Sequence, residues 1–385
     1  MPIYKMDGKR DGNQKYRVRI NYIDSHGNKR QIDRVVYGRS CAKELEAKLL
    51  SEIKEAPLHP KMTIQQLYDE YVSTKKYEVR ETTLKKSSEV LTNHVLPELK
   101  NVKISKLNPS VLQKWKTYVE EKNPKDKKLS LGMRKSIYGE FRTSLNYAVR
   151  MDYLSANPLL KVGNFKDAYE TKKEFNFYTA EEFLKFISVA AQRAKESTFL
   201  EWGYYVFFNI AFYTGLRKGE ISALKWTDIE DNILYVRRSI AQKLNGEDRE
   251  TPPKSKSSFR SLQIPAPLQE VLDEHYARYK DLDLFTNDWR ICGGLSCLRD
   301  TTVDLRNRQY AALAGVKHIR VHDFRHSHAT LLANEGINIQ EIARRLGHSK
   351  IEITWNTYSH LYPREEERAV SVLDKIVYQA CTEKK

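Results

Sequence analysis

The chain has 385 residues, which allows two or three domains, and 40% of them are hydrophobic, enough for ordinary globular cores. Its formal net charge of +16 favours a polyanionic partner, nucleic acid above all, with an anionic membrane surface as the competing reading. The sequence contains no apolar run of about 18 residues and does not begin with an apolar signal-peptide segment. We therefore expect a cytoplasmic protein that does not bind membranes.

The four cysteines do not have the spacing of a zinc site, so we expect no metal centre. Cys292 and Cys297 are close enough in sequence to form a pair, but reduced thiols are the expectation in the cytoplasm. Cys41 and Cys381 lie far from both.

Residues 1–56 are predicted to form a small sheet followed by a helix. Apolar and polar side chains alternate over residues 16–22, which predicts a strand with one buried face. Arg17 and Arg19 fall on its other face, where they would enter a DNA groove or simply keep the sheet soluble. The other predicted parts are a third strand at 3–5, a turn at 24–28, a returning strand at 30–37, and a helix capped by Ser40 that runs through Ile53.

Residues 61–158 are predicted to form a helical bundle. Thr63 and Gln66 have the spacing of a capping box. The helices are predicted at 64–74, 82–94, 109–121 and 130–151. Lys85 and Lys86 lie on the second of these helices, and Lys114 and Lys116 lie on the third. These lysines are candidate phosphate contacts, although such runs are ordinarily solvated helix faces.

A polar stretch over residues 159–178 is predicted to link this bundle to a second large unit. There, residues 179–182 cap a helix, and residues 199–213 form a very apolar helix that precedes the stretch TGLRKGE at 214–220. Glu220 lies one helical turn after Arg217, so an ion pair is expected to hold the arginine in place.

Further along, residues 233–236 and 261–265 read as strands, separated by a long polar segment that contains Lys254 and Lys256. Helices are predicted at 267–280 and 298–315. After residue 363, a charged helical tail carries an apolar stripe, which packs either on its own domain or on a neighbouring copy.

The segment 318–360 holds six of the chain's ten histidines, a density that a core-building helix does not need. His322 and Arg325 are three residues apart and share a helix face, and Tyr358 follows His348 by ten residues. Arginine binds phosphate oxygens with a rigid fork, histidine donates hydrogen bonds or moves protons, and tyrosine can be a covalent nucleophile. Together these residue types suit attack on a phosphodiester.

These motifs, in this order, resemble the tyrosine recombinase family of phage-type integrases, most of all those of temperate phages and conjugative elements. The resemblance covers residues 175–365, with weaker similarity towards the N-terminus. It implies that the catalytic residues are Arg217, Lys254, His322, Arg325, His348 and Tyr358, the last being the nucleophile. Lys254 is favoured over Lys256 as the lysine of the family's β-hairpin loop, and the resemblance gives His326 and His360 no catalytic role.

The implied fold is α+β and mainly α, with an arm-type DNA-binding domain at 1–56, a core-binding helical domain at 61–158 and a catalytic domain at 175–385. The implied activity is site-specific recombination of double-stranded DNA through a 3′-phosphotyrosyl link and a Holliday junction. The family acts as a tetramer in the nucleoid without metal, ATP or another cofactor, and it commonly employs a directionality protein and host DNA-bending proteins. The alternatives are a Xer-type resolvase, an enzyme like a type IB topoisomerase, and a non-catalytic DNA-binding regulator.

Overall fold

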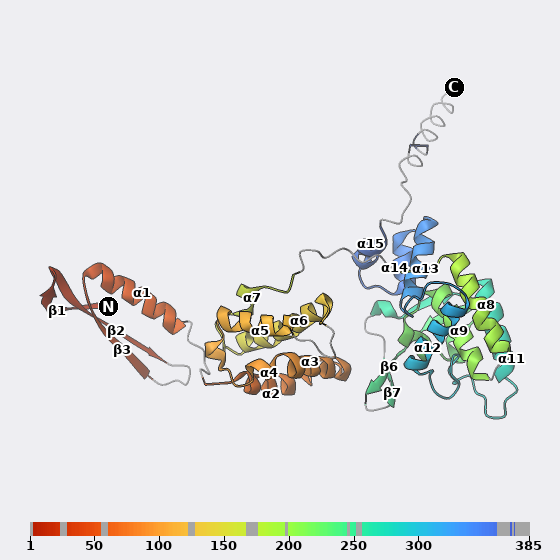
Figure 1. Cartoon of the computed structure of the whole chain (residues 1–385), viewed down its shortest axis with the longest axis horizontal. Coiled ribbons are helices and arrows are strands. Elements are labelled where there is room, and N and C mark those ends of the chain that lie inside the picture. Colours follow the sequence, from red (N-terminus) through yellow and green to blue (C-terminus); the bar gives the residue numbers. More distant parts are fainter. Residues whose placement is uncertain are drawn as a thin grey trace, which may run out of the picture. The chain divides into compact units, whose positions relative to one another are not determined.

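The structure is a computed structural model of the whole chain. It describes residues 3–23, 29–54, 61–121, 128–166, 176–196, 199–244, 247–251, 256–359, 370, 371 and 373. The chain divides into two units, residues 1–171 and 172–385. Figure 1 shows the elements of both units in sequence colours.

The first unit begins with a three-stranded antiparallel sheet, and helix α1 packs against this sheet (Figure 1). Val18 and Ile20 are buried with Ala42 and Leu49 of the helix, because alternate side chains of a strand face the same side. The elements are β1 (Ile3–Arg10), β2 (Asn13–Ile23), β3 (Lys29–Tyr37) and α1 (Arg39–Lys54).

This arrangement confirms the predicted strands and helix, with two corrections. The first strand is longer than expected, because an Asp11–Gly12 turn with positive φ at both residues joins β1 to β2 as a tight hairpin. Helix α1 begins at Arg39, so Ser40 is its second residue and not its cap.

The rest of the first unit is a helical bundle. Its core contains Trp115 and Phe141, whose rings meet edge to face with centroids 4.9 Å apart. The predicted capping box is present, with Gln66 N–H donating to Thr63 Oγ1 at 3.3 Å. The helices are α2 (Ile64–Lys75), α3 (Glu81–His94), α4 (Leu96–Leu99), α5 (Pro109–Glu121), α6 (Leu131–Arg150) and α7 (Leu159–Val162).

The polar stretch that was predicted to be a linker starts later than expected. Leu159 and Phe165 are buried in the bundle core, where the ring of Phe165 lies beside that of Trp115. Lys116 is also buried, and its ammonium donates to the carbonyl oxygens of Gly163 and Asn164. Lys116 is therefore no candidate for a phosphate contact.

The second unit has an aromatic core on which the site residues are mounted. Phe186, Phe208, Tyr310 and Phe324 form mutual ring contacts inside it. Its helices are α8 (Ala180–Glu196), α9 (Phe199–Thr214), α10 (Lys218–Ala223), α11 (Ala266–Tyr279), α12 (Asp300–Leu313), α13 (Asp323–Asn334), α14 (Ile339–Leu346) and α15 (Ile351–Tyr358).

Two small antiparallel sheets complete this unit. The first has the order β4-β5-β8, so the strands predicted at 233–236 and 261–265 do pair. The second is a hairpin, β6-β7, which occupies much of the long polar segment between them. The strands are β4 (Ile229–Glu230), β5 (Ile233–Val236), β6 (Ser239–Leu244), β7 (Glu247–Thr251) and β8 (Arg260–Gln263).

Candidate active site

The first part of the site is the turn between α9 and α10. Gly215 has φ +64°, and a Cβ there would lie 2.7 Å from the ring of His328 and 2.9 Å from Leu346. Only glycine fits this turn, which places Arg217 at the N-cap of α10. The arginine side chain is 38% exposed and donates to the carbonyl oxygen of Gly347 at 3.2 Å.

Glu220 holds this arginine, as predicted. Its carboxylate accepts from Arg217 Nη1 at 2.8 Å and from the Arg217 backbone N–H at 2.9 Å. A second cation, Arg260 of β8, donates to the same carboxylate with Nη2 at 2.8 Å and is only 3% exposed. Burial alone would raise the pKa of Glu220, but the hydrogen bonds and charges of the two arginines lower it overall. Sequence reasoning missed Arg260.

Arg325 lies on α13, buried behind the turn that carries Arg217. Its Nη1 donates to the carbonyl oxygen of Gly215 at 2.8 Å, and its Nη2 donates to that of Leu346 at 2.7 Å. Burial, followed by the charge of Arg217, lowers the pKa of Arg325 to about 9, which leaves it charged at neutral pH. Main-chain carbonyls thus fix both arginines before any substrate arrives.

His348 follows the left-handed Gly347 that ends α14. Its Nε2 lies 2.7 Å from Arg325 Nη2, and its Nδ1 lies 2.8 Å from Thr354 Oγ1. Burial and the charge of Arg325 lower the pKa of His348 to about 4, so the ring is neutral at pH 7.

Tyr358 ends helix α15 and is only 2% exposed, packed with Ala329, Ala333, Ile342 and Leu346. Burial raises its pKa to about 12, although the charge of Arg325 acts in the opposite direction.

The hydroxyl of Tyr358 is hydrogen bonded to a histidine that the sequence analysis had left without a role. His326 Nδ1 lies 2.6 Å from this oxygen. The signal for it lay in the sequence, because His326 is one turn after His322 and adjacent to Arg325.

His322 is the residue that immediately precedes α13, and its side chain is exposed. Its ring centroid is 5.3 Å from that of His326, edge to face. Desolvation by its neighbours and the charge of Arg325 lower its pKa.

Lys254 and His360 lie outside the described residues, and Lys256 is described only as the first residue of a short helical turn, 256–258. The β6-β7 hairpin that leads to this segment is held at two points. Arg290 forms an ion pair with Glu250 of β7 at 2.9 Å. Gly219 of α10 lies so close to β6 that a Cβ there would be 2.5 Å from the carbonyl oxygen of Ile240.

The candidate DNA contacts of the first unit lie apart from this group of residues in the sequence and are exposed to different degrees. Arg17 and Arg19 are partly exposed, and Asp33 of the neighbouring strand pairs with both, at 2.6 Å and 3.1 Å. Lys85, Lys86 and Lys114 are exposed on their helices, as expected for either phosphate contacts or solvated faces.

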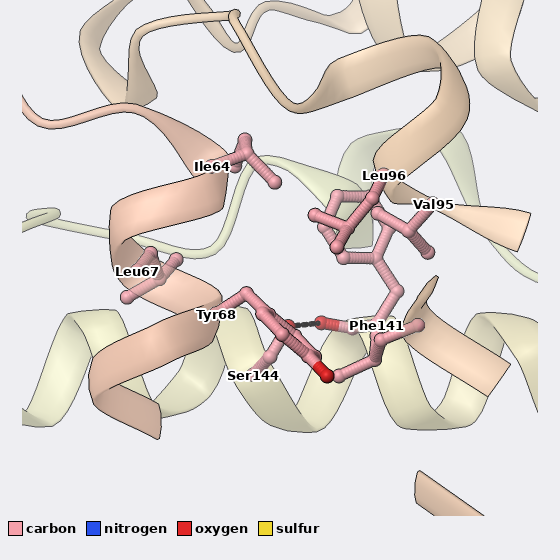
Figure 2. Close-up of a pocket in the computed structure, with 8 residues that line it drawn as sticks. Ile64, Leu67, Tyr68, Val95, Leu96, Phe141 and Ser144 are labelled. Carbon is pink, nitrogen blue, oxygen red and sulfur yellow. Dashed lines mark hydrogen bonds between the residues drawn. The ribbon is translucent and has the colours of Figure 1, made fainter. Parts of the chain in front are cut away.

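A small pocket, with a cavity volume of about 10 Å³, lies in the helical bundle (Figure 2). Its polar lining is limited to Tyr68 and Ser144, and the Ser144 hydroxyl donates to the carbonyl oxygen of Phe141 at 2.8 Å (Figure 2). None of the predicted site residues lines it, so it takes no part in the candidate site.

Three expectations about metals, thiols and membranes can be compared with the described residues. Within that part of the chain, no three His, Cys, Asp or Glu side chains are grouped so as to hold a metal ion. Among the described residues, Cys41, Cys292 and Cys297 are not joined by a disulfide. No helix among the described segments is both long and apolar enough to span a membrane.

Comparisons with known sequences support the resemblance. Residues 176–365 match the Phage integrase family, and residues 63–118 match the family described as Phage integrase, N-terminal SAM-like domain. The ICEBs1 integrase of Bacillus subtilis (strain 168) is 28% identical over 88% of this chain and 90% of its own length. A XerC-like tyrosine recombinase of Caldanaerobacter subterraneus subsp. tengcongensis is 30% identical over 72% of this chain and 74% of its own.

Solved structures share the fold. The integrase of the Tn1549 transposon, in complex with transposon right end DNA, matches with a TM-score of 0.64 and 18% identity, over 82% of this chain and all of that one. A lambda integrase dimer bound to a COC′ core site matches with a TM-score of 0.54 and 17% identity, over 95% of each chain. These matches confirm the predicted fold class, α+β and mainly α.

Proposed function

This chain belongs to the phage integrase family of tyrosine recombinases, the site-specific DNA recombinases of mobile elements, and from that premise we propose the roles of its site residues. Tyr358 attacks a DNA phosphodiester and forms a 3′-phosphotyrosyl link, releasing a 5′-hydroxyl. The energy of the broken bond stays in the new ester, so the strand is rejoined without ATP.

The cations of the site hold the phosphate. Arg217 and Arg325 bind the non-bridging oxygens, on which negative charge builds up in the transition state, and His348 adds a hydrogen bond to the phosphate. His322 either donates a hydrogen bond to the phosphate or accepts the proton of Tyr358. Lys254, on the segment after the β6-β7 hairpin, protonates the leaving 5′-oxygen. Because these side chains supply the positive charge, the proposed reaction uses no metal ion or other cofactor.

The observation that carries this proposal is the linked set of Arg217, Arg325, His348 and Tyr358. They come from three sequence segments, yet Arg217 contacts the Gly347 carbonyl, Arg325 contacts His348, and the charge of Arg325 acts on Tyr358. A protein that only binds DNA has no need for a buried tyrosine beside paired, preorganised arginines.

The proposed substrate is double-stranded DNA, on which four copies assemble and exchange strands through a Holliday junction. A lambda integrase tetramer bound to a Holliday junction supports this proposal by its fold, with a TM-score of 0.53 and 18% identity. We assign residues 1–56 to arm sites, the bundle from residue 61 to the core site, and residues 175–385 to catalysis. A directionality protein and a host DNA-bending protein are the proposed accessory partners.

The test is a nicked suicide duplex made from the ends of the element that carries this gene, incubated in EDTA and analysed on a denaturing gel. The wild type should give a covalent protein–DNA band, and Tyr358→Phe should bind the duplex and give none. Tyr276→Phe is the matched control, because it removes a hydroxyl that donates to Asn287 in the same unit, outside the site. A band with Tyr358→Phe would place the nucleophile elsewhere, and no band with the wild type would favour a non-catalytic regulator.

The DNA that the protein acts on distinguishes two enzymatic alternatives from the proposed function. Relaxation of supercoiled plasmid without any partner site would favour an enzyme like a type IB topoisomerase. Recombination of a chromosomal resolution site, and not of the element's ends, would favour a Xer-type resolvase.

A further inference from the structure

The hydrogen bond between His326 and Tyr358 has no part in the roles assigned above. His326 lies on the first turn of α13, Tyr358 lies at the end of α15, and Nδ1 and Oη are 2.6 Å apart. The tyrosine is almost wholly buried, and the histidine is half-buried. Apolar side chains of α13 and α14 pack around the rest of the tyrosine ring.

The direction of this hydrogen bond follows from the two protonation states. Desolvation, followed by the neighbouring His322, lowers the pKa of His326 to about 4, and burial raises the pKa of Tyr358 to about 12. At neutral pH the tyrosine therefore keeps its proton, and the lone pair on the histidine Nδ1 accepts it as a hydrogen bond. The ring then carries its own proton on Nε2.

We propose that His326 accepts the proton of Tyr358 when the tyrosine oxygen attacks the DNA phosphorus, a step that rests on the proposed function. The Oη–H bond breaks and the proton passes to Nδ1, while the Oη–P bond forms. The bond from phosphorus to the 5′-oxygen breaks, and that oxygen takes a proton from Lys254. In rejoining, the imidazolium returns its proton to the departing tyrosine oxygen.

The charges around His326 are suited to this transfer once DNA is bound. Arg320, His322 and Arg325 disfavour the imidazolium, whereas Asp323 favours it, and Tyr358 faces the ring from α15. A phosphate bound by Arg325 places a negative charge near the His326 ring. That charge favours the imidazolium, so it raises the pKa of His326 back towards its ordinary value. The base is therefore weak in the free protein and becomes stronger where its substrate is in place.

This assignment divides the work between two histidines on one helix face. The exposed His322 is left to donate a hydrogen bond to the phosphate, and His326, one turn later, serves the nucleophile. Substitution of His322 and substitution of His326 should therefore change the pH dependence of the cleavage rate in different ways.

The test measures the single-turnover rate of covalent complex formation on the nicked duplex between pH 5.5 and 9.5. His326→Phe keeps the ring volume without an acceptor, and His326→Asn keeps an acceptor oxygen that does not take up a proton. Both should be slower than the wild type by about 10²- to 10⁴-fold at pH 7. The deficit should shrink as pH rises, because hydroxide can then remove the tyrosine proton.

A substrate with sulfur in place of the 5′-bridging oxygen separates the two proton transfers. A thiolate leaves without a proton, so this substrate should restore cleavage by Lys254→Ala and not by His326→Phe. Thermal unfolding and DNA binding of each variant check its fold, and His326→Asn carries the test if the phenylalanine variant does not fold.

Three results would overturn the proposal: rates within threefold of the wild type, a deficit that is the same at every pH, or full recovery in His326→Asn. The last would make His326 only a positioning partner. If wild-type protein formed no covalent complex, the proposed function itself would fail, and this step with it.

Discussion

Nη2 of Arg325 lies 2.7 Å from Nε2 of His348. An arginine has only donors, so this nitrogen of the histidine must be the acceptor, and the histidine carries its proton on Nδ1, directed at Thr354. In the free protein His348 therefore has no proton on Nε2 to offer a phosphate. If Nδ1–H keeps its hydrogen bond to Thr354, the ring must gain a second proton, on Nε2, when the phosphate binds beside Arg325.

DNA binding should accordingly take up a proton at His348. Its pKa is about 4 in the free site, and a bound phosphate anion raises it, so affinity should increase as pH falls from 8 to 6. Calorimetric titrations in two buffers of different ionisation enthalpy measure this uptake. His348→Gln donates an amide hydrogen without titrating and should show a smaller uptake, whereas equal uptake in both proteins would contradict the assignment.

Arg217→Lys should reduce cleavage by about 100-fold or more, because a lysine ammonium does not reproduce the planar guanidinium fork that binds phosphate oxygens bidentately while it also contacts Glu220 and the Gly347 carbonyl. Single-turnover cleavage is the measurement. Arg344→Lys is a matched control, since Arg344 pairs with Glu341 at the same i,i+3 spacing on the surface. Equal effects of the two substitutions would remove Arg217 from the site.

Arg260→Met should destabilise the protein by about 3–5 kcal/mol, because it leaves the buried Glu220 with one cation fewer. Urea unfolding measures this loss. The double variant Arg260→Met/Glu220→Gln removes the uncompensated charge and should be less destabilised than Arg260→Met alone. If the losses of unfolding free energy of the two single substitutions simply added in the double variant, the two side chains would not be energetically coupled.

Gly219→Ala should destabilise the contact between α10 and β6 by about 1–3 kcal/mol, because the new methyl group would lie 2.5 Å from a carbonyl oxygen. Helix propensity alone would make Gly219→Ala stabilising, so a loss of stability would report the close contact with β6. Gly139→Ala is the control on the exposed face of α6, where a Cβ meets nothing within 4 Å, and it should be neutral or slightly stabilising. Equal thermal midpoints for the two variants would show that β6 can move away from α10 at little cost in stability.

The sequence predicted those parts of the fold and site that depend on local patterns. The helices follow from apolar periodicity and caps, and the pair Arg217–Glu220 follows from i,i+3 spacing. The β6-β7 hairpin was missed, although its Asn245–Gly246 dipeptide is a hairpin signal, because the surrounding residues are polar.

Arg260 and His326 could not be assigned in the same way. Arg260 meets Glu220 across 40 positions of the chain, and His326 meets Tyr358 across 32. The spacing from His322 placed His326 on the same helix face, but its contact with Tyr358, like that of Arg260 with Glu220, depends on how helices and strands pack. The motif identified the chemistry, and the packing decided which further side chains take part in it.

Three of the groups that hold the two arginines are main-chain carbonyls, those of Gly215, Leu346 and Gly347. A carbonyl persists through any substitution that keeps the backbone path. Leu346 should therefore accept other apolar side chains of similar volume, whereas the two glycines, both at positive φ, should accept almost none. Mutational tolerance around this site is thus set by backbone geometry, and residues can be indispensable there without offering any reactive side chain.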